Sequence, residues 1–138
     1  MEKAFCVSIP VFEAGQLKAI GYIDNKAVTK EVVNTPKKAK KLLLTTDTSG
    51  KPLKADGSDI LFIRAIVCDA DGNQVVDSQA SILFTIKGNA KLIGQNPILA
   101  EAGIATILLQ AGENPQTISI VAVSDGLKPA NSNIISVK

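Results

Sequence analysis

The sequence of 138 residues contains no histidine and no tryptophan. Histidine is the general base of Ser-His-Asp and Cys-His catalytic sites and a ligand in most zinc sites, so its absence excludes those classes of site. The G-x-S-x-G, P-loop and dinucleotide-binding motifs are absent as well. We therefore predict no catalytic, metal-binding or cofactor-binding residues in this chain.

Aromatic residues are scarce, at 4% of the chain. A surface that binds sugars or bases by stacking usually exposes several rings. The strand pattern places Phe84 on a core-facing side, so we interpret the rings as core residues rather than as a sugar-binding platform. The rings are Tyr22, Phe5, Phe12, Phe62 and Phe84.

The chain has only two cysteines, Cys6 and Cys68, and no apolar run of about 18 residues. We expect two buried free thiols, with a disulfide between them as the alternative. Membrane insertion is not expected. The first residues, MEKAFCVSIPVF, lack the long apolar region and the small-residue cleavage site of a secretory signal.

The net charge of +2 is close to neutral, but basic residues gather in one segment at Lys37, Lys38, Lys40 and Lys41. A short basic run without interleaved aromatic residues is more typical of a solvated linker or a strand edge than of a nucleic-acid-binding patch. We therefore predict no nucleic-acid partner.

The clearest local pattern runs from Lys54 to Val76 and reads KADGSDILFIRAIVCDADGNQVV. Clusters of Asp, Gly, Ser and Asn, which favour turns, bound an apolar-rich run from Ile60 to Cys68. The run alternates with period two, which predicts a half-buried strand with Arg64 on the opposite face. The residues on the buried face are Leu61, Ile63, Ala65 and Val67.

The remaining chain predicts further short strands and one domain boundary. Pro36 and the charges around it interrupt the strand pattern, so we divide the chain into residues 1–36 and 37–138. About seven short strands after Pro36 indicate an all-β, immunoglobulin-like antiparallel β-sandwich, with an open meander barrel as the second choice. Residues 94–102 are expected to form a loop with at most one helical turn. The other predicted strands span residues 4–9, 16–23, 26–34, 39–46, 81–87, 90–93, 103–110, 116–124 and 131–137.

Two groups of acidic residues are candidates for catalysis or for calcium binding. Glu13, Glu31, Glu101 and Glu113 are scattered near turns or on polar strand faces. A glycosidase needs two carboxyl groups about 5–10 Å apart in a cleft, which a small sandwich rarely provides. We therefore expect no hydrolysis by this chain alone.

The second group, from Asp69 to Asn73, resembles the opening of an EF-hand loop. However, Gln74 occupies the position of the invariant glycine, and Ala80 occupies that of the bidentate glutamate. A hairpin turn with positive φ at Gly72 explains the same residues without a calcium ion. We therefore predict a turn.

A succession of motifs carries a family resemblance: LLLTTDTSGKPLKADGSDILFIRAIVCDADGNQVVDSQASILFTIKGNAKLIG, then GIATILLQAG, then ISIVAVSDGLK. It resembles the C-terminal immunoglobulin-like domain of family-2 glycoside hydrolases, most of all the β-galactosidases of Bacteroides-type bacteria. The matching positions are Lys54, Ala55, Asp56, Gly57, Asp59, Asp69, Gly72, Asn73, Val75, Phe84, Ile86, Gly88, Leu92, Gly94, Gly103, Ala105, Ser124, Gly126 and Leu127.

The resemblance implies that residues 37–138 are a non-catalytic accessory domain of a longer hydrolase. Residues 1–36 look like the last strands of a small sandwich domain that precedes it. The catalytic carboxylates would then lie in a barrel domain outside this chain, and the partners would be other domains of that enzyme, with carbohydrate as a further candidate. The enzyme is expected in the periplasm, secreted or at the cell surface. Because bacterial adhesins of the invasin and intimin type share the pattern, an adhesion or carbohydrate-binding module is the alternative.

Overall fold

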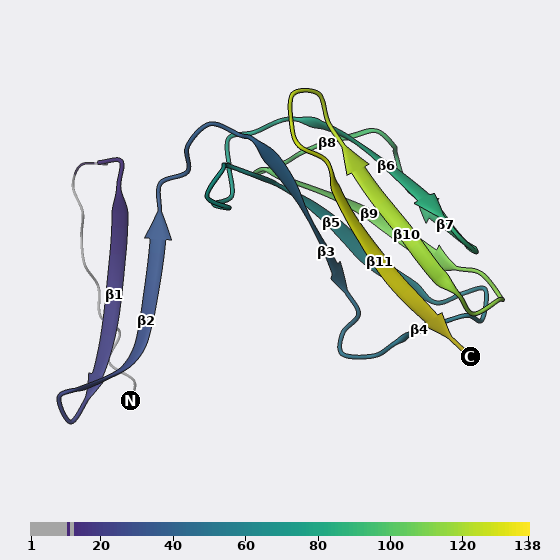
Figure 1. Ribbon diagram of the computed structural model, residues 1–138, viewed down its shortest axis with the longest axis horizontal. Coiled ribbons are helices and arrows are strands. Elements are labelled where there is room, and N and C mark those ends of the chain that lie inside the picture. The colour runs from purple at the N-terminus through teal and green to yellow at the C-terminus, as the bar shows by residue number, and fades with distance from the viewer. Residues whose placement is uncertain (1–10, 12) are drawn as a thin grey trace. The chain divides into compact units, whose positions relative to one another are not determined.

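The computed structural model describes residue 11 and residues 13–138 (Figure 1). The chain separates into two compact units, residues 1–35 and residues 36–138. The predicted strand over residues 4–9 lies outside the described residues, as do Phe5, Cys6 and Phe12. None of the described residues belongs to a helix that could cross a membrane.

The described part of the first unit is a β-hairpin formed by β1 (Gln16–Ile23) and β2 (Lys26–Asn34). Asp24 and Asn25 form its two-residue turn with φ of 48° and 60°. Two successive residues of positive φ match the twist of antiparallel strands, and Asp and Asn adopt positive φ more readily than most other non-glycine residues. The predicted hairpin is confirmed.

The second unit is a sandwich of two sheets. One sheet has the order β4-β11-β10-β6-β8, and the other has the order β3-β5-β9-β7. The all-β immunoglobulin-like sandwich is thus confirmed. The strands are β3 (Lys41–Asp47), β4 (Leu53–Lys54), β5 (Ile60–Cys68), β6 (Ser81–Lys87), β7 (Ala90–Ile93), β8 (Ile98–Leu99), β9 (Ile104–Ala111), β10 (Thr117–Val123) and β11 (Ala130–Val137).

Three details differ from the sequence prediction. Residues 94–102 contain the short strand β8 rather than a helical turn. The Asn96 side chain explains this, because it accepts a hydrogen bond from the N–H of Phe84 (2.9 Å) and donates one to its carbonyl (2.7 Å), extending the β6 ladder. Strand β4 was not predicted. It pairs with β11 in parallel, so the sandwich is not purely antiparallel.

The core lies between the two sheets, and the period-two pattern decides which side chains enter it. On β5 the four residues predicted to face inward are at most 4% exposed. On β6, Ile82 and Phe84 are buried while Leu83 between them is 40% exposed. Among the described residues, the largest fully buried side chain is that of Phe84, which belongs to a core formed by residues of both sheets.

Phe84→Ala is expected to lower the free energy of unfolding by about 3–5 kcal/mol, since it removes a buried ring and leaves a cavity. The neighbouring variant Leu83→Ala removes an outward side chain, so its expected loss is at most about 1 kcal/mol. Urea titration of both variants measures the difference. Equal losses would contradict the assigned orientation of β6.

Candidate functional site

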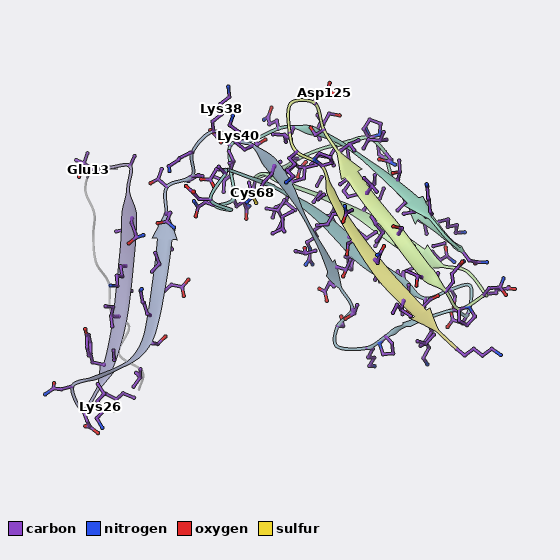
Figure 2. The ribbon with its side chains drawn as sticks, viewed as in Figure 1. Glu13, Lys26, Lys38, Lys40, Cys68 and Asp125 are labelled. Carbon is purple, nitrogen blue, oxygen red and sulfur yellow. The ribbon has the colours of Figure 1, made fainter. Side chains whose placement is uncertain are left out.

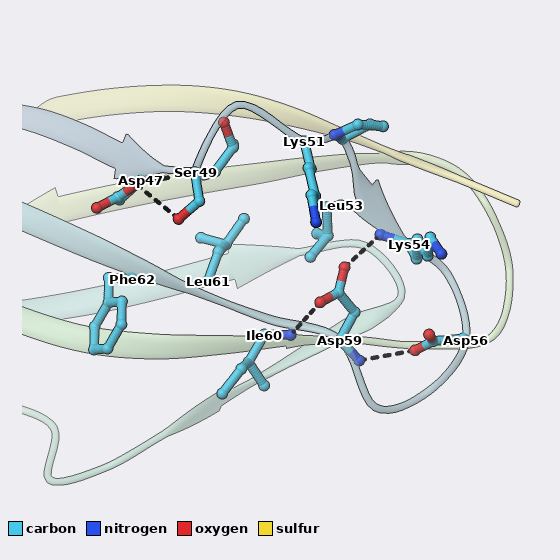
Figure 3. A pocket seen from close by; sticks show the side chains of 12 residues that line it. Asp47, Ser49, Lys51, Leu53, Lys54, Asp56, Asp59, Ile60, Leu61 and Phe62 are labelled. Atoms are coloured by element: carbon cyan, nitrogen blue, oxygen red, sulfur yellow. Dashed lines mark hydrogen bonds between the residues drawn. The ribbon is translucent and has the colours of Figure 1, made fainter.

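An open hollow of about 580 Å³ lies beside β4 (Figure 3). It is formed by the β3–β4 connection, by β4 and by the first residues of β5. Three aspartates line it, at positions 47, 56 and 59. Sequence reasoning did not single out this place, because its parts are separated by turns and its walls depend on the pairing of β4 with β11.

The carboxylates in this hollow accept hydrogen bonds from nearby backbone N–H groups (Figure 3). Asp47 accepts from the N–H of Ser49 at 3.0 Å, and Asp56 accepts from the N–H groups of Ser58 (2.9 Å) and Asp59 (2.8 Å). These donors lower the pKa of Asp47 and of Asp56. Asp59 accepts from the N–H of Lys54 at 2.8 Å.

The lowered pKa of Asp47 and of Asp56 is the opposite of what a glycosidase needs in its general acid. A general acid is a carboxyl group whose pKa is raised. Asp47 and Asp56 instead accept hydrogen bonds from N–H groups two or three residues later in the chain, as in Asx turns.

The four glutamates considered from the sequence do not come together as a pair within either unit. Glu101 precedes β9 and Glu113 follows it, and eight residues of extended strand separate the two by about 27 Å. Glu13 lies before β1, at one end of the hairpin (Figure 2), whereas Glu31 is opposite Ala19 within it. Among the described residues, moreover, no three or more His, Cys, Asp or Glu side chains gather in a metal-binding arrangement.

Asp69 is the one acidic residue buried in the sandwich, with 0% exposure. Its Oδ2 accepts hydrogen bonds from the N–H of Lys37 at 2.9 Å and from the Asn73 amide at 3.0 Å. Its Oδ1 accepts from the N–H groups of Asp71 and Asn73, both at 2.9 Å. The Lys37 N–H and the Asn73 amide, in that order, are the main causes that hold the pKa of Asp69 far below its usual range.

This network explains the spacing that resembles an EF-hand. Both carboxylate oxygens of Asp69 point at N–H donors of the chain, and Gly72 adopts the positive φ (96°) that the predicted turn requires. The turn is thus confirmed. The bond from Lys37, which lies 32 residues earlier, was not predicted.

The basic segment is held against the same turn. Lys37 Nζ lies 2.9 Å from Asp71 Oδ2, and Lys41 Nζ donates to the carbonyl of Ala70 at 3.0 Å. Figure 2 shows the side chains of Lys38 and Lys40 projecting from the segment that leads into β3. The lysines at positions 37 and 41 therefore act as the linker and strand-edge residues that the sequence suggested.

Cys68 is buried at the end of β5 and forms no disulfide. Burial raises the pKa of its thiol, which makes the reactive thiolate less accessible. The prediction of a buried free thiol is confirmed for Cys68, whereas Cys6 lies outside the described residues.

Residues 42–133 match the family described as glycoside hydrolase family 2 C-terminal domain 5. The match covers more than half of the chain and nearly all of the sandwich. The chain belongs to this family.

Relatives of this C-terminal domain 5 include three glycosidases. A beta-galactosidase of Thermoanaerobacter pseudethanolicus is 32% identical over 78% of this chain and 14% of that protein. A beta-galactosidase of Bacteroides ovatus is 30% identical over 86% of this chain and 15% of that protein. A beta-glucuronidase of Formosa agariphila is 30% identical over 91% of this chain and 14% of that protein. The chain thus spans about a seventh of the length of the curated relatives that it matches.

Solved structures agree with this assignment. A beta-glucuronidase from glycoside hydrolase family 2 matches with a TM-score of 0.73 and 29% identity, over 91% of this chain and 14% of that one. A beta-glycosidase from Bacteroides vulgatus matches with a TM-score of 0.77 and 18% identity, over 90% and 18%. The D00-D0 domain of intimin matches with a TM-score of 0.60 and 20% identity, over 91% and 66%. The last two likenesses show the fold alone.

The residues that carry the family resemblance have structural roles in this C-terminal domain 5. Gly57 has a positive φ of 77°, and its carbonyl accepts a hydrogen bond from the Gln110 side chain at 2.6 Å. Gly103 has φ of 74°, and a Cβ there would collide with the carbonyl of Val75. Phe84 and Ala105 are core residues. The shared pattern therefore specifies turns and packing.

Asp69→Asn is expected to destabilise the sandwich and to weaken its acid dependence. The pKa of Asp69 in the fold lies below its unfolded value of about 3.9, so its charge stabilises the fold above that pH. This contribution is lost as the pH falls from about 4 through the folded pKa. Thermal unfolding between pH 7 and pH 2.5 should show a smaller decline for the variant than for the wild type.

Asp71→Asn is the matched control, because Asp71 is exposed and its backbone N–H still reaches Asp69 after the change. Its unfolding temperature at pH 7 should stay close to that of the wild type, since exposed ion pairs contribute little. If both variants lost equal stability, the role of the buried carboxylate would be refuted.

Proposed function

We propose that this chain is a non-catalytic structural domain within a longer glycoside hydrolase. Its curated relatives are named as beta-galactosidases and a beta-glucuronidase, and the chain corresponds to about a seventh of each. The reacting carboxylates would then lie in a part of the enzyme outside this chain. The expected periplasmic, secreted or surface location stays a prediction.

One observation carries the non-catalytic assignment. The acidic residues of the shared pattern, Asp56, Asp59 and Asp69, all accept hydrogen bonds from backbone N–H groups. These donors lower the pKa of Asp56 and of Asp69 and so stabilise their charged forms. These two carboxylates are therefore suited to fixing turns and unsuited to protonating a glycosidic oxygen.

The hairpin of β1 and β2 supports the wider proposal that a preceding domain completes the first unit. An isolated two-stranded sheet is marginally stable in water. Both faces of this hairpin carry exposed apolar side chains: Leu17 and Val33 on one face, Ile20 and Tyr22 on the other. Such faces fit the last strands of a small sandwich, as the sequence predicts for residues 1–36.

An adhesion or carbohydrate-binding module is the second candidate function. The likeness to the D00-D0 domain of intimin favours it, but only at the level of the fold. The family match over residues 42–133 favours the hydrolase domain. A glycan array with reproducible micromolar binding to the purified chain would favour the second candidate.

The purified chain is expected to release no chromophore from nitrophenyl β-galactoside or nitrophenyl β-glucuronide above a blank without protein. The longer enzyme that contains it should hydrolyse one of these compounds under the same conditions. Turnover by the purified chain alone would refute the non-catalytic assignment. Absence of turnover by the longer enzyme on a wide set of glycosides would refute the parent activity.

A further inference from the structure

Strand β5 is apolar on both of its faces. Its inward residues fill the core, yet Ile60 and Phe62 on the outer face are 50% and 48% exposed, and Ile66 on that face is half-buried. Antiparallel sheets with one face in water usually alternate apolar and polar residues, whereas strands covered on both faces read as nearly continuous apolar runs. The run ILFIRAIVC, interrupted only by Arg64, is of the second kind.

The apolar residues of neighbouring strands continue this outer face in two rows. In the first row, Leu43 of β3 lies opposite Ile66, and Ile66 lies opposite Ile104 of β9. Residues directly opposite one another in a ladder share a face, with their Cβ atoms about 5 Å apart. The first row is therefore a continuous apolar strip across three strands.

The second row crosses the same sheet closer to its other end. Phe62 lies opposite Leu108 of β9, and Leu108 lies opposite Ile93 of β7. Between the two rows runs one polar row, in which Arg64 lies opposite Thr45 and Thr106. Beyond the second row, Ile60 lies opposite Gln110, which lies opposite Lys91. We refer to these four rows as the outer face of the four-stranded sheet.

In the described part of the chain, no outward apolar row crosses three strands of the other sheet, and Leu83 opposite Val123 is the one outward apolar pair in the registers of β6, β10 and β11. Val121 lies opposite Thr85 on one side and Asn131 on the other, and Ile135 lies opposite Thr117. Its outward apolar side chains are thus mostly separated by polar ones, as in a solvated face. Contiguous exposed apolar surface marks an interaction site, whereas scattered apolar residues need no explanation.

We propose that the outer face of the four-stranded sheet packs against another domain of the same polypeptide. This inference rests on the proposed function, because it requires the longer enzyme. The four strands have 7, 9, 8 and 4 residues, so at about 4.8 Å between strands and about 3.4 Å per residue their outer face presents roughly 450 Å². That is less than the approximately 800 Å² per partner of a stable interface between separate proteins, so a second copy of the chain would be held weakly.

A tethered domain meets this size requirement. Covalent linkage replaces free association by a millimolar effective concentration, and interdomain contacts within a chain are smaller and more polar than those of obligate dimers. The partner surface would be apolar where it covers the two rows, with polar groups opposite Arg64, which is already paired with Asp47 at 3.5 Å. The half-exposed ring of Phe62 would be the largest side chain buried in the contact.

Hydroxyl-radical footprinting with mass spectrometry tests the proposal on the longer enzyme and on this chain alone. Phe62 and Leu43 should be oxidised in the purified chain and at least fivefold more slowly in the longer enzyme. Ile135, which is 67% exposed on the other sheet, is the internal control and should be oxidised at similar rates in both.

Equal oxidation of Phe62 in both proteins would overturn the proposal. Protection of Phe62 already in the purified chain would also overturn it, and sedimentation would then distinguish a second copy from residues 1–35 as the covering group. Neither outcome depends on the turnover assay, so failure of this contact and failure of the hydrolase assignment can be told apart. Phe62→Ser gives a second check, since it should lower the unfolding temperature of the longer enzyme more than that of the purified chain.

Discussion

The hydrogen bonds to the buried carboxylate of Asp69 are the interaction on which the rest of the sandwich depends. Four N–H donors surround it, and one of them belongs to Lys37, at the start of the second unit. A buried charge is tolerated only when its hydrogen bonds are satisfied, and here they all come from the chain itself. The carboxylate thereby fixes the turn after β5 and the segment leading into β3. These are the two ends that must meet for Lys41 to pair with Cys68.

Aspartates also accept hydrogen bonds from backbone N–H groups at the other end of β5. Asp56 and Asp59 bind the N–H groups of the turn between β4 and β5, so each end of this strand is set by an aspartate that accepts from the backbone. Several residues that carry the family resemblance thus build the turns and the core. Asp56, Asp59 and Asp69 accept hydrogen bonds from backbone N–H groups, and Phe84 and Ala105 lie in the core.

The sequence was sufficient for what depends on local periodicity and turn chemistry. It predicted β5 and β6 with the correct inward faces, the Asp24-Asn25 hairpin and the turn at Gly72. It did not predict what depends on distant partners. Strand β4 exists only because β11 lies beside it, the Asn96 side chain replaces a strand neighbour of Phe84, and Lys37 reaches Asp69 across 32 residues. The hollow beside β4 was not predicted either, because it is lined by β4, which depends on β11. The sequence predicted a half-buried β5 with Arg64 on its outer face, and the structure shows that Phe62 and Ile66 share this face.

The account depends on Asp69 being charged, buried and bound to the backbone in the folded chain. A carbon-13 NMR titration of the Asp69 carboxyl group tests this directly, with the resonance assigned through the loss of that signal in Asp69→Asn. We predict that the resonance stays at its ionised position down to the pH at which the fold is lost, because the surrounding donors lower the pKa. A titration midpoint near the ordinary value of about 4 in the folded protein would contradict the account.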